Sequence, residues 1–156
     1  MYKAITKNGN TFFYYNEQLI LKAVTSKYFC YYKFYIEDIN DIKLLEMSIV
    51  SLFGFFKKYS IISQKLNERV ELLKHRNDLV LKLKDENISI LKKRHLMKFE
   101  GDFVSNGEKQ GEFYNQLTMF ESSFTFNFQR IDETNIYFFI LFSILVIDKF
   151  NFGPSA

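Results

Sequence analysis

Residues Glu86–Phe99 read ENISILKKRHLMKF, and this stretch combines two patterns. In its first half Ile88 and Ile90 stand two residues apart, with other side chains between them, which is typical of a β-strand with one buried face. Its second half brings four basic residues together: Lys92, Lys93, Arg94 and His95. We therefore predict a central strand that ends in a cluster of positive charge, directed at a polyanion or at solvent.

The charge of the whole chain is distributed unevenly. The 156 residues carry a net charge of +3. From Lys57 to Lys98 there are twelve Lys and Arg against five Asp and Glu, a balance of +7, whereas the remaining residues have a balance of −4. Clustered positive charge is the footprint of a site for nucleic acid or another anionic surface. The alternative is a basic face that is merely solvated.

Composition argues for one folded domain without a cofactor. Hydrophobic residues make up 47% of the chain and charged residues 25%, which is typical of a globular protein. A single cysteine, Cys30, excludes an internal disulfide, and we expect it to be a buried small hydrophobe. His75 and His95 lie in basic surroundings, and the chain has no glycine-rich phosphate loop and no nucleophile elbow. We expect no metal site, no cofactor and no enzyme activity.

Several elements can be predicted from periodicity. Asn8-Gly9 indicates a hairpin turn, 28–36 and 124–130 have the composition of strands, and 112–120 fits a short helix. A longer helix is predicted over 41–58, because the apolar residues Ile42, Leu45, Ile49, Leu52 and Phe56 are spaced by three and four.

Two segments keep alternative interpretations. Residues 61–99 fit a hairpin, with strands at 68–74 and 86–99 and a polar tip at 75–85, or one long helix with coiled-coil spacing. The run Ile136–Ile147 has no charge over twelve residues. It is shorter than the ~20 residues of a membrane span, so a buried strand or a helix covered by a partner is favoured over a membrane anchor.

With the hairpin interpretation, the order of elements is β-α-β-β-α-β. This order predicts a ferredoxin-like α+β fold with a four-stranded antiparallel sheet and a long basic hairpin. Residues 28–131 would form this domain, with an N-terminal extension over 1–27 and an apolar C-terminal extension over 132–156. The fold serves many functions and identifies none by itself.

Four segments then resemble the family of small-subunit ribosomal protein ten, the S-ten family. Lys33–Lys58 (KFYIEDINDIKLLEMSIVSLFGFFKK) resembles the first strand and helix, and Glu68–Lys74 (ERVELLK) the strand that enters the family's hairpin. Glu86–Leu96 (ENISILKKRHL) resembles the return strand with its basic cluster, and Leu117–Ile131 (LTMFESSFTFNFQRI) the second helix and last strand. The family's proline-containing hairpin tip has no counterpart in His75–Asp85.

The resemblance implies a structural protein of the head of the small ribosomal subunit. Its expected partners are ribosomal RNA of the small subunit and neighbouring ribosomal proteins, with no small-molecule substrate and no membrane. The resemblance implies RNA contacts for Lys92, Lys93, Arg94, His95, Arg69 and Lys74, and charge alone adds Arg76, Lys82 and Lys84. These side chains would contact phosphates.

The location follows from coding bias. Phe occurs 19 times and Tyr 10 times, and the codons of these residues, like those of Ile, Lys and Asn, are AT-rich. Together with the ribosomal resemblance and the lack of an import signal, this favours a mitochondrial protein made inside the organelle, with a cytoplasmic protein as the alternative.

Two other functions compete with the ribosomal one. A coiled coil over Leu66–Leu91 with an apolar tail would make a helical interaction or membrane-associated protein. A small phage or immunity-type inhibitor would instead bind one protein partner through an edge strand.

Overall fold

The computed structural model describes residues 1–52, 56–75, 78–94, 98–117, 122–132 and 134–151. These residues form twelve strands and one helix. The strands are β1 (Tyr2–Lys7), β2 (Asn10–Tyr15), β3 (Gln18–Tyr28), β4 (Tyr31–Glu37), β5 (Lys43–Leu52), β6 (Phe56–Gln64), β7 (Glu71–His75), β8 (Asp78–Lys82), β9 (Asn87–Arg94), β10 (Phe99–Ser105), β11 (Glu108–Leu117) and β12 (Ser122–Phe128). The helix is α1 (Asn135–Asn151).

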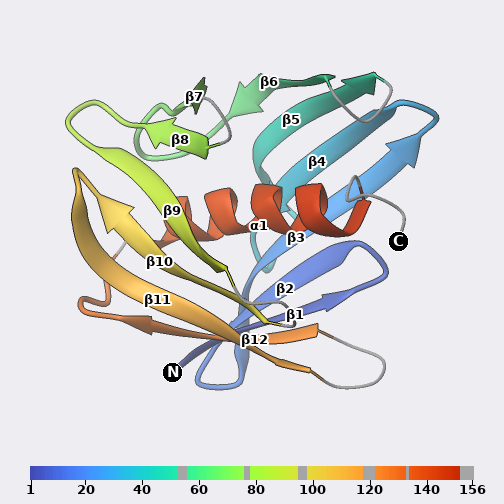
Figure 1. Ribbon diagram of the computed structural model, residues 1–156. Coiled ribbons are helices and arrows are strands. Elements are labelled where there is room, and N and C mark those ends of the chain that lie inside the picture. The colour runs from blue at the N-terminus through green and yellow to red at the C-terminus, as the bar shows by residue number, and fades with distance from the viewer. Residues whose placement is uncertain (53–55, 76–77, 95–97, 118–121, 133, 152–156) are drawn as a thin grey trace.

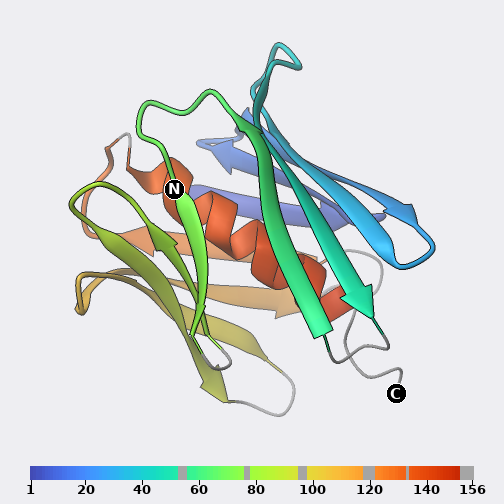
Figure 2. The same ribbon diagram turned by 90° about the horizontal axis from the view of Figure 1, so that it is seen from above.

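All twelve strands belong to one antiparallel sheet that curls around the helix (Figure 1). Strands that follow one another in the chain are neighbours, except for β6 and β7, and β1 also pairs with β12. The edges of the sheet are therefore β6 and β7, which approach each other and leave a seam in a nearly closed barrel (Figure 2).

The helix α1 is the centre of the core. The side chains from Tyr137 to Ile147 are all buried, so the helix is apolar on every face and must be surrounded. The uncharged run of the tail is thus a helix covered by the chain's own sheet, not by a partner. Within the described residues, no helix combines the length and apolar character that a membrane span needs.

Phenylalanine rings join the helix to the sheet. Phe142 lies 4.9–6.3 Å, centroid to centroid, from five rings of the inner sheet face, which belong to Phe13, Phe99, Phe113, Phe124 and Phe126. Such tilted and edge-to-face pairs are the preferred geometry of aromatic contacts.

Two inner positions must be glycine to make room for these rings. A Cβ atom on Gly101 would lie 2.7 Å from Cε1 of its cross-strand neighbour Phe113. A Cβ on Gly111 would lie 2.8 Å from Cδ1 of Phe128 and 2.6 Å from the Asn127 carbonyl oxygen. Both glycines therefore let large rings lie flat over the strand.

The edge strand β6 is fastened to the end of α1 by polar contacts. The Tyr59 hydroxyl donates a hydrogen bond to Asp148 (2.6 Å), and Lys57 forms an ion pair with the same carboxylate (3.3 Å). Burial and the Asp148 carboxylate raise the pKa of Tyr59, so the phenol stays protonated. Asp148 sits unfavourably at the negative end of the helix dipole, and these two partners offset that cost.

The predicted ferredoxin-like fold is wrong, because the described residues of both predicted helices lie in strands or a turn. The segment 41–58 forms β5 and part of β6, and Leu45, Met47 and Ile49 are all buried on one face. Residues four apart share a face in a strand as well as in a helix, so Leu45 and Ile49 fitted both patterns. In the second predicted helix, residues 112–117 form the end of β11, where Phe113 is buried, and 118–120 lie outside the described residues.

Of the two interpretations of 61–99, the long helix is wrong, and the hairpin is correct in its two strands, β7 and β9, but wrong in pairing them with each other. A strand, β8, lies in the middle of the predicted polar tip, and its Val80 pairs with Leu73 of β7. The segment is therefore a three-stranded meander of β7, β8 and β9 in place of one long hairpin or a coiled coil.

Several local predictions are confirmed. Asn8 and Gly9 have positive φ angles of 52° and 78° in a tight turn between β1 and β2. Ile88 and Ile90 are buried on β9. Phe124 and Phe126 are buried on β12.

The segment 1–27, predicted as an extension, contains β1, β2 and most of β3, which lie inside the sheet.

Candidate nucleic-acid interface

Antiparallel strands place alternate turns at opposite ends of the sheet. One end, where α1 finishes, is formed by the last residues of β1, β3, β5, β7, β9 and β11 and by the first residues of the strands that follow them. Exposed lysines gather there, and we name this the basic end: Lys7, Lys27, Lys58, Lys74, Lys92 and Lys98. The negative end of the α1 dipole points in the same direction and favours cations at this position.

Few acidic residues face this lysine set. In the part of the chain that the structure describes, Asp78, Glu100 and Asp148 lie near the basic end, and Asp148 is held by Lys57. Glu100 forms an ion pair with Lys98 (3.8 Å). Among the same residues no ion pair is present for Lys58, Lys74 or Lys92, so their charges face solvent.

The opposite end carries both signs of charge. It includes Asp38, Asp41 and Glu68 together with Lys65 and Arg69, and Lys22 pairs with Asp41. The two ends therefore differ in electrostatic potential. An anionic ligand approaching the protein is drawn to the basic end.

The structure divides the predicted RNA-binding residues between these ends. Lys74 and Lys92 lie at the basic end, and Arg94 is the last residue of β9 there, although its side chain is outside the described residues. Arg69, Lys82 and Lys84 lie at the opposite end. His95 and Arg76 also fall outside the described residues.

Lys93 lies on the outer face of the sheet in a network of ion pairs. Its ammonium is 3.1 Å from Asp102 and 3.9 Å from Glu112, and Lys109 contacts the same two carboxylates at 3.0 and 2.7 Å. Partial burial alone would raise the pKa of Asp102, but hydrogen bonds from Lys109 and Lys93 outweigh it and hold that pKa below its usual range. The hydrogen bond from Lys109 likewise lowers the pKa of Glu112. Lys93 therefore links neighbouring strands through its ion pairs, and its ammonium group is less available to a ligand than that of Lys92.

The structure adds a feature that the sequence does not predict, an aromatic tip formed by Tyr28, Phe29 and Tyr31. The turn between β3 and β4 lies at the basic end, where Phe29 is fully exposed and Tyr28 is 54% exposed. The rings of Tyr28 and Tyr31 lie 5.6 Å apart, and Leu52, at the end of β5, is half exposed. Cys30, predicted to be buried, is only partly buried in this turn.

The sequence does not reveal the aromatic tip, because the composition of 28–36 predicts one continuous strand. Its first residues actually end one strand and turn before the next, which only the break in alternation at Phe29-Cys30 could have indicated.

No family model, curated protein or solved structure matches this chain. The function must therefore be argued from the residues themselves. In the described part of the chain, no group of three or more His, Cys, Asp or Glu side chains has an arrangement that could hold a metal ion. What the basic end offers is a ring of ammonium groups beside exposed aromatic faces.

Proposed function

We propose that this protein is a non-catalytic binding module that holds single-stranded RNA at its basic end. The observation that carries the proposal is the gathering of exposed lysines from separate strands beside the aromatic tip of Tyr28, Phe29 and Tyr31. Lysine ammonium groups bind phosphates as point charges and read no sequence. Exposed aromatic rings stack on unpaired bases, which a duplex does not offer.

The dimensions suit a short stretch of RNA. Across the seam, β4, which follows the aromatic tip, is separated from β9, which carries Lys92, by four strand spacings and the unpaired gap between β6 and β7. The four spacings alone correspond to about 19 Å along the rim of the sheet. A single strand of RNA of a few nucleotides covers such a distance, in line with the roughly 4–16 nucleotides that one OB fold binds.

The ribosomal function and the mitochondrial location stay predictions. The S-ten resemblance depended on helices at 41–58 and 112–120, and the described residues 43–52, 56–58 and 112–117 of these segments are in strands. The proposal for RNA does not need that resemblance, because it depends on the charge and exposure of the basic end. Attachment to the small ribosomal subunit would be one setting for such a module.

The salt dependence of RNA binding tests the proposal. A fluorescein-labelled single-stranded RNA is titrated with the protein at several salt concentrations, and binding is followed by fluorescence anisotropy. We expect the affinity to fall as salt rises, because each phosphate contact releases a counterion. The variant K58A/K74A/K92A removes three exposed lysines of the basic end and should lower the slope of log K against log salt by about 2, since each contact with a single strand contributes about 0.7.

A matched variant controls for charge alone. K65A/K82A/K84A removes three exposed lysines from the opposite end, so its net charge is the same. Its slope should stay close to that of the unaltered protein. Equal losses in both variants would refute the proposed site. Binding to anionic lipid vesicles without binding to RNA would refute the proposed ligand.

A further inference from the structure

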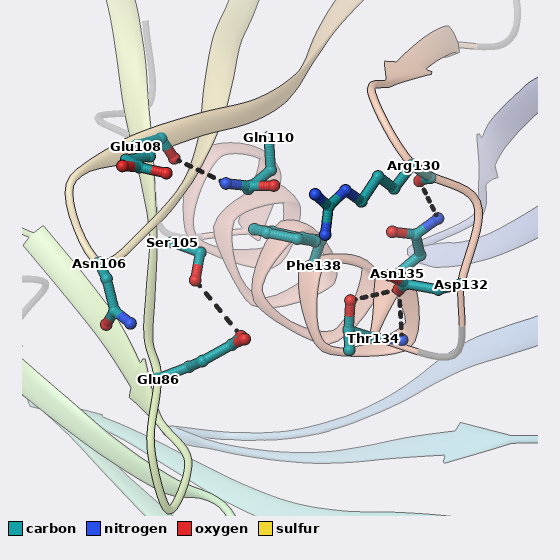
Figure 3. Close-up of a pocket in the computed structure, with 10 residues that line it drawn as sticks. All are labelled: Glu86, Ser105, Asn106, Glu108, Gln110, Arg130, Asp132, Thr134, Asn135 and Phe138. Carbon is teal, nitrogen blue, oxygen red and sulfur yellow. Dashed lines mark hydrogen bonds between the residues drawn. The ribbon is translucent and has the colours of Figure 1, made fainter.

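A polar pocket lies at the opposite end of the molecule, beside the start of α1 (Figure 3). It has a volume of about 240 Å³. Its walls come from the β8–β9 and β10–β11 turns, from β10 and β11, and from the segment between β12 and α1. The lining residues are Glu86, Ser105, Asn106, Glu108, Gln110, Arg130, Asp132, Thr134, Asn135 and Phe138.

The floor of the pocket is formed by two buried side chains of α1, Asn135 and Phe138. Phe138 is buried, and its ring packs 5.1 Å from Phe103 and 5.7 Å from Phe128. Asn135 is also buried and donates a hydrogen bond from Nδ2 to the backbone oxygen of Arg130 (3.2 Å). The segment that carries Arg130 is therefore fixed to the first turn of the helix.

Most polar groups of the wall are already engaged. Asn106 accepts from the Asn87 backbone N–H (2.9 Å) and donates to the Asp85 carbonyl (3.3 Å). Asp132 accepts hydrogen bonds from the backbone N–H and the hydroxyl of Thr134. These groups hold the loops in place and leave little capacity for a ligand.

Two charged groups retain capacity and point into the same space. The guanidinium of Arg130 is the only cation of the lining, and no ion pair to it is present within the described residues. From the other side, the Glu86 carboxylate extends toward the same space and accepts one hydrogen bond from the Ser105 hydroxyl (3.3 Å) (Figure 3). A guanidinium offers five donors in a planar fork that matches a carboxylate, and a carboxylate accepts from an ammonium group.

We propose that this pocket binds a small zwitterion of the amino-acid class, with its carboxylate on Arg130 and its ammonium group on Glu86. The pocket volume is about 240 Å³. It lies below the roughly 300–1,000 Å³ of pockets for drug-sized ligands, which suits a free amino acid. The inference goes beyond RNA binding, differs from the expectation of no small-molecule ligand, and depends on residues at the other end of the sheet.

The test is a set of titrations of the ¹⁵N-labelled protein, followed by ¹H–¹⁵N correlation spectra. The probes are the common L-amino acids, added separately at millimolar concentration. We expect at least one of them to shift the amide signals of Ser105, Gln110 and Asn135 in a saturable manner. If none of the amino acids shifts these signals, the inference is refuted.

Altered probes and variants then test the two charged contacts. The N-acetyl derivative lacks the ammonium group and the amide derivative lacks the carboxylate, so each should bind at least tenfold more weakly. Arg130→Ala should abolish the shifts, and Glu86→Gln should weaken binding of the amino acid but not of its N-acetyl derivative. Lys84→Ala, outside the pocket lining, is the control and should leave the shifts unchanged.

The outcomes separate this inference from the RNA proposal. Arg130→Ala should leave RNA binding at the basic end unaltered, so failure of one does not entail failure of the other. Equal binding of the N-acetyl derivative and the amino acid would refute the zwitterion. Unchanged shifts in Arg130→Ala, with the rest of the spectrum native, would refute the site.

Discussion

Replacing Phe142 by alanine tests the packing of the helix inside the sheet. The side chain is fully buried and its ring contacts five other rings, from β2, β10, β11 and β12. Truncation of a buried phenylalanine costs about 3–5 kcal/mol through lost transfer energy and the cavity left behind. Because the aromatic pairs are lost as well, we expect a value at the upper end of that range.

Such a loss is a large fraction of the stability of one domain, which is about 5–15 kcal/mol. For a chain of this length it corresponds to a fall in the melting temperature of roughly 8–20 °C. Urea unfolding followed by circular dichroism measures the free energy of unfolding. Circular dichroism is the suitable signal because the chain has no tryptophan whose fluorescence could report on the core. Phe29→Ala is the matched control, since its ring is fully exposed and its loss should change stability by less than about 0.5 kcal/mol. A cost below about 1 kcal/mol for Phe142→Ala would contradict a helix enclosed by the sheet.

Three further substitutions probe the sheet. Gly111→Ala should destabilise the protein by about 1–3 kcal/mol, because its Cβ would overlap the Phe128 ring and the Asn127 carbonyl, and thermal unfolding would detect this. Thr25→Val should stabilise it by about 1 kcal/mol in urea unfolding, because the buried Thr25 hydroxyl has no hydrogen-bond partner among the residues described. Asp102→Asn should destabilise the protein at neutral pH. Because the pKa of Asp102 is lowered in the folded state, its contribution is complete above the carboxyl's ordinary pKa near 4 and is lost as the pH falls through the folded-state value. The difference in melting temperature between this variant and the unaltered protein should therefore shrink below about pH 4, and a difference independent of pH would contradict the ion-pair network.

Turns and single strands could be predicted from the sequence because their signals are local. Asn8-Gly9 requires positive φ at both positions, which few other residues adopt readily. The alternation of Phe124 and Phe126 is read equally well in any sheet. Neither signal depends on what the rest of the chain does.

The overall fold could not be predicted, because its deciding interaction is long-range. The apolar run 136–147 has the composition of a buried element, but nothing in its own residues says that the preceding strands surround it. Without that helix as a core, a twelve-stranded sheet has no reason to curl, so shorter α+β arrangements fit the same local patterns. Leu45 and Ile49 are four residues apart and share a face in a helix as well as in a strand. This spacing therefore fits the helix that an α+β fold requires.

The candidate site was predicted only in part for a similar reason. The S-ten resemblance implied contacts for Lys74 and Lys92, which lie at the basic end, whereas charge alone suggested Lys82 and Lys84, which strand direction places at the other end of the sheet. The aromatic tip comes from residues 28–31, far away in sequence, and joins the basic end only because β3 and β4 turn there. Arg130 and Glu86, which face each other across the pocket, are likewise distant in sequence and carry no shared motif.

Mapping RNA onto the folded protein shows residue by residue whether it binds at the basic end. Single-stranded RNA is added to the ¹⁵N-labelled protein, and shifted amide signals are assigned along the chain. We predict that the shifts cluster at Lys7, Lys27, Phe29, Lys74 and Lys92, at one end of the sheet, and that Phe29→Ala weakens binding by about 1–3 kcal/mol per stacked base. Shifts confined to Arg69, Lys82 and Lys84 at the opposite end, or no shifts at low salt, would contradict the account.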